Sequence, residues 1–170
     1  SGYPYPIKIP NTYKKDIFIS YRASSWGWGT WKDIWEKVDW EVKDFSIFIS
    51  DQKVQNLFDR GGQDLTPMLK AQMKEKIDSW AIRWSYAHFK NNAYCLYPIV
   101  PLCKNIGTDK SGTHSSSSPK LDVELRVSDR DLILDPSPEL NAEIVFEIQK
   151  LFKLTLLRRI INFIKFFCQL

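Results

Sequence analysis

The 170 residues are enough for one domain with a buried core, and 44% hydrophobic and 26% charged residues are ordinary for a folded protein. The net charge is +4, but Lys150–Leu170 holds five basic residues and no acidic one, so the remainder carries −1. A nucleic-acid-binding domain usually spreads basic residues over a folded face, so a near-neutral body argues against a nucleic-acid partner. Seven tryptophans are many, and tryptophan readily stacks on sugar rings and other flat ligands.

The cysteines bear on the cellular compartment, and the first residue bears on whether the sequence is a whole protein. Cys95, Cys103 and Cys168 form no C-x-x-C pair and leave an odd count, and no secretory signal is present, so we expect a reducing cytoplasm. The chain begins at Ser1 without a methionine, which we interpret as an excerpt or a truncated product.

The first predicted elements are a strand, a loop and a helix. Residues 1–10 are rich in Pro and Tyr and predict extended chain, and residues 16–20 (DIFIS) alternate as a short strand does. Residues 24–29 (SSWGWG) are too glycine-rich for regular structure and predict a loop. Thr30, with Asp33 three residues later, predicts a helix start. The residues with helical spacing after it are Trp31, Ile34, Trp35 and Val38.

Helices dominate the rest of the prediction. Residues 44–59 predict a helix that ends at DRGGQD. An apolar stripe then predicts one helix or two abutting helices, which KNN ends; its members are Met73, Ile77, Trp80, Trp84 and Ala87. Residues 93–100 predict a buried strand. LDVELRV and DLIL predict short strands or extended segments, and the chain is predicted helical from about Pro138.

Two motifs leave alternatives open. SSWGWGTWKDIW is typical of a ligand platform or of a tryptophan-rich core corner, and we expect Trp31 and Trp35 in the core and Trp26 and Trp28 freer. In KIDSWAIRW, Asp78 or its neighbour Ser79 is either an N-cap or, for Asp78, a general base that accepts a proton from a hydroxyl.

The histidines and the single Asp-x-Asp do not predict a metal site. His88 lies beside the apolar stripe and is expected to be a hydrogen-bonded structural residue, whereas His114 lies in a glycine-bearing loop with an exposed polar role. No other ligands stand at metal spacing around either residue. Asp129 and Asp131 are one residue apart, a spacing that is common by chance.

The tail from residue 150 to residue 170 predicts a basic amphipathic helix. Its polar stripe comprises Thr155, Arg158, Arg159, Asn162, Lys165 and Gln169. This pattern suits a helix that lies in an anionic membrane surface, and it is too charged to span a bilayer. The alternative is docking on another part of the protein or on a partner.

As a set, SGY followed by proline, SWGWGTWKDIW, KIDSWAIRW and YPIVPLCKNIGTDKSGTH resemble the C-terminal half of bacterial sugar transferases. These are family 2-like glycosyltransferases of GT-A fold, found in capsule and surface polysaccharide loci. The likeness covers about residues 1–115, and a more distant one is to the N-acetylglucosaminyltransferase I type.

The resemblance implies an α/β fold, α+β as a fragment. Residues 1–115 would form the acceptor-side half of the GT-A domain, residues 116–137 a linker with short strands, and residues 138–170 the basic helical tail. Asp78, or a neighbour, would be the base for an inverting displacement at the anomeric carbon. Contacts to acceptor and donor would come from Trp26, Trp28, Gly107, Thr108, Gly112, Thr113 and His114.

The family's donor half, which binds the nucleotide sugar and Mn²⁺ or Mg²⁺, is missing from the sequence. We therefore expect a glycosyltransferase fragment with little activity alone. The full-length enzyme would transfer sugar from a nucleotide-sugar donor to a glycan or lipid-linked acceptor in surface polysaccharide synthesis, in the cytoplasm at the inner face of the plasma membrane. The alternative is a non-catalytic carbohydrate-binding or membrane-associated module.

Overall fold

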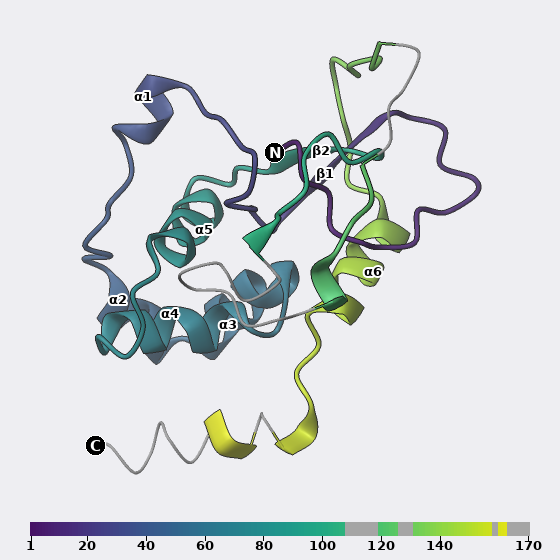
Figure 1. Ribbon diagram of the computed structural model, residues 1–170. Helices are drawn as coiled ribbons and strands as arrows, with labels where there is room; N and C mark the ends of the chain where they lie inside the picture. Colours follow the sequence, from purple (N-terminus) through teal and green to yellow (C-terminus); the bar gives the residue numbers. More distant parts are fainter. Residues whose placement is uncertain (108–118, 126–130, 158–159, 163–170) are drawn as a thin grey trace.

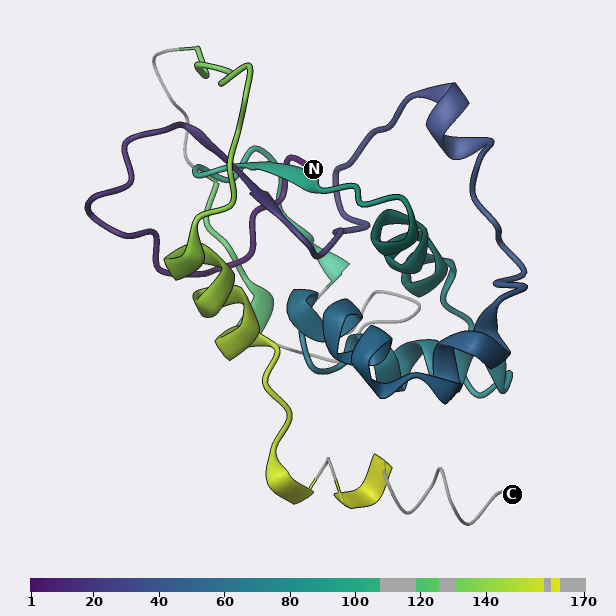
Figure 2. The ribbon, with the colours of Figure 1, turned by 180° about the vertical axis from the view of Figure 1, so that it is seen from behind.

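The structure is a computed structural model that describes residues 1–107, 119–125, 131–157 and 160–162. Helices surround a small antiparallel sheet, as expected for a mixed α and β chain. In Figures 1 and 2, α6 lies to one side of the sheet and the helices α2 to α5 lie to the other. The general class agrees with the sequence prediction.

The sheet consists of β1 (Ile17–Ser20) and β2 (Cys95–Pro98), which pair from Ile17 with Pro98 to Ser20 with Cys95. Every residue of β1 is buried, so both faces of this strand are covered. An apolar, β-branched run suits such a strand because it buries side chains on both faces. The strands predicted at 16–20 and 93–100 are thus confirmed.

The helix predicted after Thr30 is a single turn. Helix α1 (Lys32–Trp35) has Trp31 at its N-cap position, without a side-chain cap, so the predicted cap by Thr30 is wrong. No residue of α1 is buried. Because packing of an apolar face supplies most helical stability, nothing extends this helix to Val38.

The predicted helix at 44–59 is two helices, α2 (Phe45–Ser50) and α3 (Gln52–Phe58). Asp51 separates them with φ −112° and ψ 102°, and its carboxylate accepts hydrogen bonds from the amides of Lys53 and Val54. The side chain therefore caps α3 and stops α2 from continuing into it.

The chain then passes through a 3₁₀ turn, η1 (Asp59–Gly61), into α4 (Leu65–Met73) and α5 (Trp80–Lys90). The apolar stripe thus belongs to two abutting helices. Gly62 has φ +140°, a conformation for which glycine is suited, and it ends the turn as the DRGGQD motif predicts. Asn91 occupies the C-cap position of α5, so KNN is a helix end.

After β2 the described chain is mostly irregular until α6 (Ala142–Leu151). A short 3₁₀ turn, η3 (Pro119–Leu121), precedes it. Residues 122–125 and 131–134 form no strand, which leaves the extended alternative for these segments. Asn141 starts α6 by accepting a hydrogen bond from the amide of Ile144 at 3.1 Å.

A continuous helix from Pro138 is wrong, because α6 runs from Ala142 to Leu151 and the next helical residues that the structure describes are 156–157 and 160–162. The guanidinium of buried Arg22 lies 3.5 Å from the centre of the Phe152 ring. The amide of Leu154 donates to Gln63 Oε1 at 3.1 Å. The amides of Phe152 and Lys153 still bond to carbonyls of α6, whereas the amide of Leu154 bonds to the turn before α4.

Two apolar clusters form the core and meet at α5. The first comprises Tyr3, Tyr5, Phe18, Ala23, Trp84, Cys95, Tyr97, Val123, Ile144 and Ile148. The second comprises Val42, Phe48, Phe58, Leu65, Leu69, Ile82 and Tyr86. Trp84 points to the first cluster, and Ile82 and Tyr86 to the second, so α5 joins the sheet and α6 to the α2–α4 helices.

Candidate functional site

Five tryptophans from separate segments form one cluster, which we call the tryptophan cluster: Trp28, Trp35, Trp40, Trp80 and Trp84. The closest ring centroids are 4.5 Å apart, between Trp35 and Trp40, and Trp28 lies 5.3 Å from Trp84 and 5.5 Å from Trp80. Residues from the loop before α1, from α1, from the α1–α2 link and from α5 therefore share one aromatic assembly.

The cluster has a buried base and an exposed rim. Trp84 is 4% exposed, whereas Trp35 and Trp80 are 39% and 40% exposed. Trp31, outside the cluster, is 77% exposed. The predicted core position of Trp31 is therefore wrong. Trp35 is only partly covered, because its contacts within the tryptophan cluster leave part of the ring exposed.

Trp26 and Trp28, which were expected to be freer, are partly buried against the first core cluster. The Trp26 ring packs edge-on against Tyr3, with centroids 4.7 Å apart. Gly27, at φ +51°, sits so close to Cys103 that a Cβ would lie 2.1 Å from its sulfur. The glycine thus folds the loop back onto the body of the protein.

Asp78 lies two residues before Trp80, on the link that leads into α5. Ser79 occupies the N-cap position, but its side chain makes no capping hydrogen bond, and its amide donates to Gln72 Oε1 at 2.6 Å. The exposed Asp78 carboxylate makes no hydrogen bond or ion pair with a described residue. Neither side chain caps the helix, so the carboxylate of Asp78 is available to a ligand.

The loop that begins after β2 starts beside Gly27. The amides of Leu102 and Cys103 both bond to the carbonyl of Gly2, whose own amide bonds to the carbonyl of Gly27. The Gly107 amide donates to Asn105 Oδ1 at 2.9 Å. The structure therefore places the start of this loop next to the Trp26–Trp28 turn. The remaining residues assigned to it lie outside the described residues: Thr108, Gly112, Thr113 and His114.

His88 packs against Trp84, with ring centroids 4.6 Å apart. Its Nδ1 is buried and has no hydrogen-bond partner in the part of the chain that the structure describes, so the expected hydrogen bond is absent at this nitrogen. Burial, together with the charge of the terminal amine, lowers the pKa of His88 to about 4. The neutral ring is a packing element of the cluster's base, as expected.

Within the described ranges, no group of three or more His, Cys, Asp or Glu residues stands close enough to hold a metal ion. Asp131 is exposed, and Asp129 lies outside those ranges. The described helices also include none with the length and hydropathy needed to cross a bilayer.

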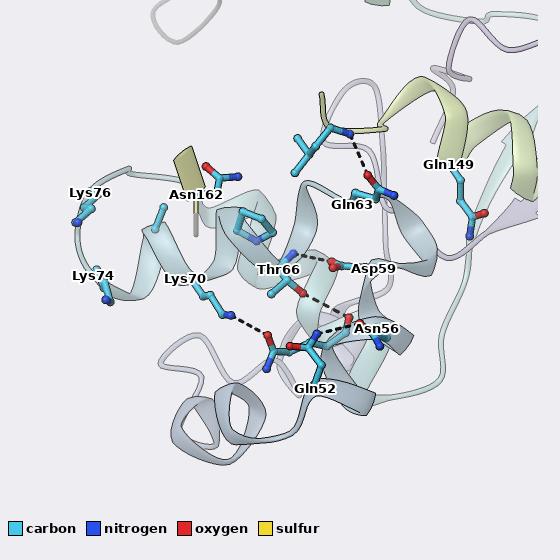
Figure 3. Close-up of a pocket in the computed structure, with 14 residues that line it drawn as sticks. Gln52, Asn56, Asp59, Gln63, Thr66, Lys70, Lys74, Lys76, Gln149 and Asn162 are labelled. Atoms are coloured by element: carbon cyan, nitrogen blue, oxygen red, sulfur yellow. Dashed lines mark hydrogen bonds between the residues drawn. The ribbon is translucent and has the colours of Figure 1, made fainter. Parts of the chain in front are cut away.

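A cleft of about 600 Å³ lies between α3, α4 and a wall formed by Gln149, Leu154 and Asn162, and no tryptophan of the cluster lines it. Figure 3 shows Asp59, Thr66 and Lys70 at its centre, with amide side chains around them. Burial raises the pKa of Asp59 to about 6, helped by the charge of Asp64 and opposed by hydrogen bonds from Thr66 and by the charge of Lys70. Sequence patterns gave no sign of this cleft, because its walls are about 90 residues apart in the chain.

Comparisons of the chain with protein-family models, with curated proteins and with solved structures find no match.

Proposed function

We propose that this chain is the acceptor-side part of a GT-A glycosyltransferase, which transfers a sugar from a nucleotide-sugar donor to a glycan or lipid-linked acceptor. The observation that supports it is the exposed rim of the tryptophan cluster, with Asp78, whose carboxylate has no partner among the described residues, two positions before Trp80. The motif resemblance supplies the reaction class. A sugar stacked on Trp35 and Trp80 would lie close to Asp78, because Asp78 and Trp80 belong to the same short segment of the chain.

The rim would bind the acceptor sugar by stacking. An indole face packs well against the C–H face of a sugar ring, and Trp35 and Trp80 are each partly exposed over a fixed base of buried Trp84. A rigid base keeps the rims in place, so little side-chain freedom is lost on binding.

Asp78 would act as the base. Its carboxylate accepts the proton of an acceptor hydroxyl while that oxygen attacks the anomeric carbon of the donor. The bond from that carbon to the diphosphate oxygen breaks, and its electron pair leaves with the diphosphate. The described residues of this chain do not fit the Mn²⁺ or Mg²⁺ of the family, so the proposal assigns that ion, and the donor, to another part of the enzyme.

The experiment compares variants in the protein as it is encoded, with a panel of nucleotide sugars and glycan acceptors. Asp78→Asn should lower kcat by about a hundredfold or more and leave acceptor affinity unchanged, because general-base catalysis contributes about 10²–10⁴-fold. Glu75→Gln, an exposed acid on the same link, is the matched control and should keep full activity. Retained activity in Asp78→Asn excludes Asp78 as the base.

A second candidate, a non-catalytic carbohydrate-binding module, is favoured by one observation: no described residue holds the Asp78 carboxylate in a fixed orientation. In that case Trp80→Ala abolishes glycan binding and no nucleotide sugar is turned over. Turnover that depends on Asp78 rejects the module.

The tail supports a proposed contact with a membrane surface through residues 150–170. Leu156 and Leu157 are 73% and 68% exposed, and Ile160 is 48% exposed. Exposed leucines beside a segment with five basic residues suit an anionic bilayer surface. The interruption at 153–155 means that any such contact begins after Thr155.

A further inference from the structure

Half of the residues that line the cleft carry groups that both donate and accept hydrogen bonds. Six of its fourteen lining residues carry carboxamides: Gln52, Gln55, Asn56, Gln63, Gln149 and Asn162. We call it the amide cleft. In Figure 3 the labelled amides surround Asp59, Thr66 and Lys70.

Several of these amides keep free hydrogen-bonding groups. Gln63 uses Oε1 to accept from Leu154, and Gln149 uses Nε2 to donate to the carbonyl of Arg60. The Nε2 of Gln63 and the Oε1 of Gln149 make no hydrogen bond with a described residue, and neither does the amide of Asn162. The cleft therefore offers free donors and free acceptors, and hydrogen bonds fix the positions of the Gln63 and Gln149 side chains.

The other members of the array are fixed in the same way. Gln52 Nε2 donates to Asn56 Oδ1 at 2.9 Å, which leaves the second halves of both amides free. The buried Gln55 donates to the carbonyl of Ile49 and accepts from Lys70 at 2.7 Å. The side chain of Gln55, in α3, is therefore hydrogen-bonded to both α2 and α4.

The lining holds three lysines and one acid, so the charges favour a neutral ligand only at the centre of the cleft, where Asp59 lies. The Asp59 carboxylate sits at the centre, and Lys70, whose charge acts on it, donates a hydrogen bond to Gln55. Lys74 and Lys76 lie together at one end, as Figure 3 shows. An anion in the middle of the cleft would meet the charge of Asp59, whereas hydroxyl groups pair with carboxamides and carboxylates alike.

We propose that the amide cleft is a second carbohydrate site, which binds one neutral, hydroxyl-rich sugar unit. Its volume of about 600 Å³ lies within the range of small-molecule sites and exceeds the need of one hexose. It is separate from the tryptophan rim and stands independently of the transfer reaction. A site without an aromatic wall binds through hydrogen bonds alone, so we expect weak affinity, with a dissociation constant on the order of millimolar.

The test is a titration of the ¹⁵N-labelled chain with glucose, galactose, N-acetylglucosamine and, separately, inorganic phosphate, followed by the side-chain NH₂ signals. We expect saturable shifts of Gln63, Gln149 and Asn162 with at least one sugar. Asn162→Ala should weaken that binding by about two- to tenfold, the effect of one hydrogen bond. Asn162 bonds to no described residue, so the variant leaves the fold intact.

Two controls separate this site from the tryptophan rim. Asn11→Ala removes an amide from an exposed loop outside the cleft and should change nothing. Trp80→Ala should leave the cleft signals and their affinity unchanged. The proposal is overturned if no sugar shifts the cleft amides, if sugar shifts are confined to the indole signals, or if phosphate alone saturates the cleft.

Discussion

Asp59 is the acid whose removal we expect to stabilise the protein. Its carboxylate is half-buried in the amide cleft and accepts a hydrogen bond from the amide of Thr66 at 2.9 Å. Burial raises its pKa from 3.8 to about 6, so at neutral pH the folded state carries a charge that it disfavours. Asparagine has the same shape and can still accept from Thr66, but it carries no charge.

The size of the effect follows from the pKa. A rise from 3.8 to about 6 corresponds to about 3 kcal/mol, at about 1.4 kcal/mol per pH unit. Solvent reaches part of this side chain, which halves the figure to about 1.5 kcal/mol. The substitution also removes the favourable interaction between the carboxylate and the charge of Lys70. We therefore expect Asp59→Asn to stabilise the fold by about 1 kcal/mol at pH 7.5.

The sign of the pH dependence is fixed by the direction of the shift. Because the pKa is higher in the folded state, the folded protein binds more protons between pH 4 and pH 6, and the wild type loses stability relative to the variant as pH rises through that window. Near pH 4 the difference should fall toward zero. Urea unfolding at pH 4.5, 6.0 and 7.5, followed by tryptophan fluorescence, measures both quantities.

Asp78→Asn is the matched control, since it removes one negative charge from an exposed carboxylate without a described partner. Its effect on the free energy of unfolding should stay within about 0.5 kcal/mol at each pH. The reasoning is refuted if Asp59→Asn is less stable than the wild type at pH 7.5, or if its advantage is the same at pH 4.5.

Three further changes test other parts of the structure. Gly27→Ala places a Cβ 2.1 Å from a neighbouring thiol at φ +51° and should cost about 2–3 kcal/mol in thermal unfolding, whereas Gly29→Ala meets nothing within 4 Å and should be near neutral. Arg22→Lys breaks a two-bond ion pair with an aspartate and should lower the unfolding free energy by about 2–4 kcal/mol in urea; an unchanged midpoint contradicts the importance of that pair. Leu156→Glu should abolish sedimentation with phosphatidylglycerol vesicles, while Leu134→Glu, at a similarly exposed position, should not; equal binding by both refutes the membrane contact.

The strands and the helix ends at DRGGQD and KNN were predictable because their signals are local. DIFIS and AYCLYPIV are apolar runs of strand length, and the two glycines after Arg60 mark a turn. The break at Asp51 was missed although an aspartate before QKVQ is a recognisable N-cap.

The exposure of the tryptophans was not predictable from spacing alone. Trp31 and Trp35 fall on a helical stripe, but spacing shows only which residues share a face and not whether another element covers it. The amide cleft could not be predicted from the sequence for a different reason. Its walls come from α3, α4 and the chain end, and polar residues without periodicity carry no signal that they will meet.

The positions of α1 and the chain end set the geometry of any membrane-bound form. Figures 1 and 2 show α1, which carries Trp35, at one end of the molecule and residues 160–162 at the other. A bilayer held by the tail therefore faces away from the tryptophan rim. In the proposed membrane-bound form, an acceptor would therefore meet the rim at the end of the molecule opposite the bilayer.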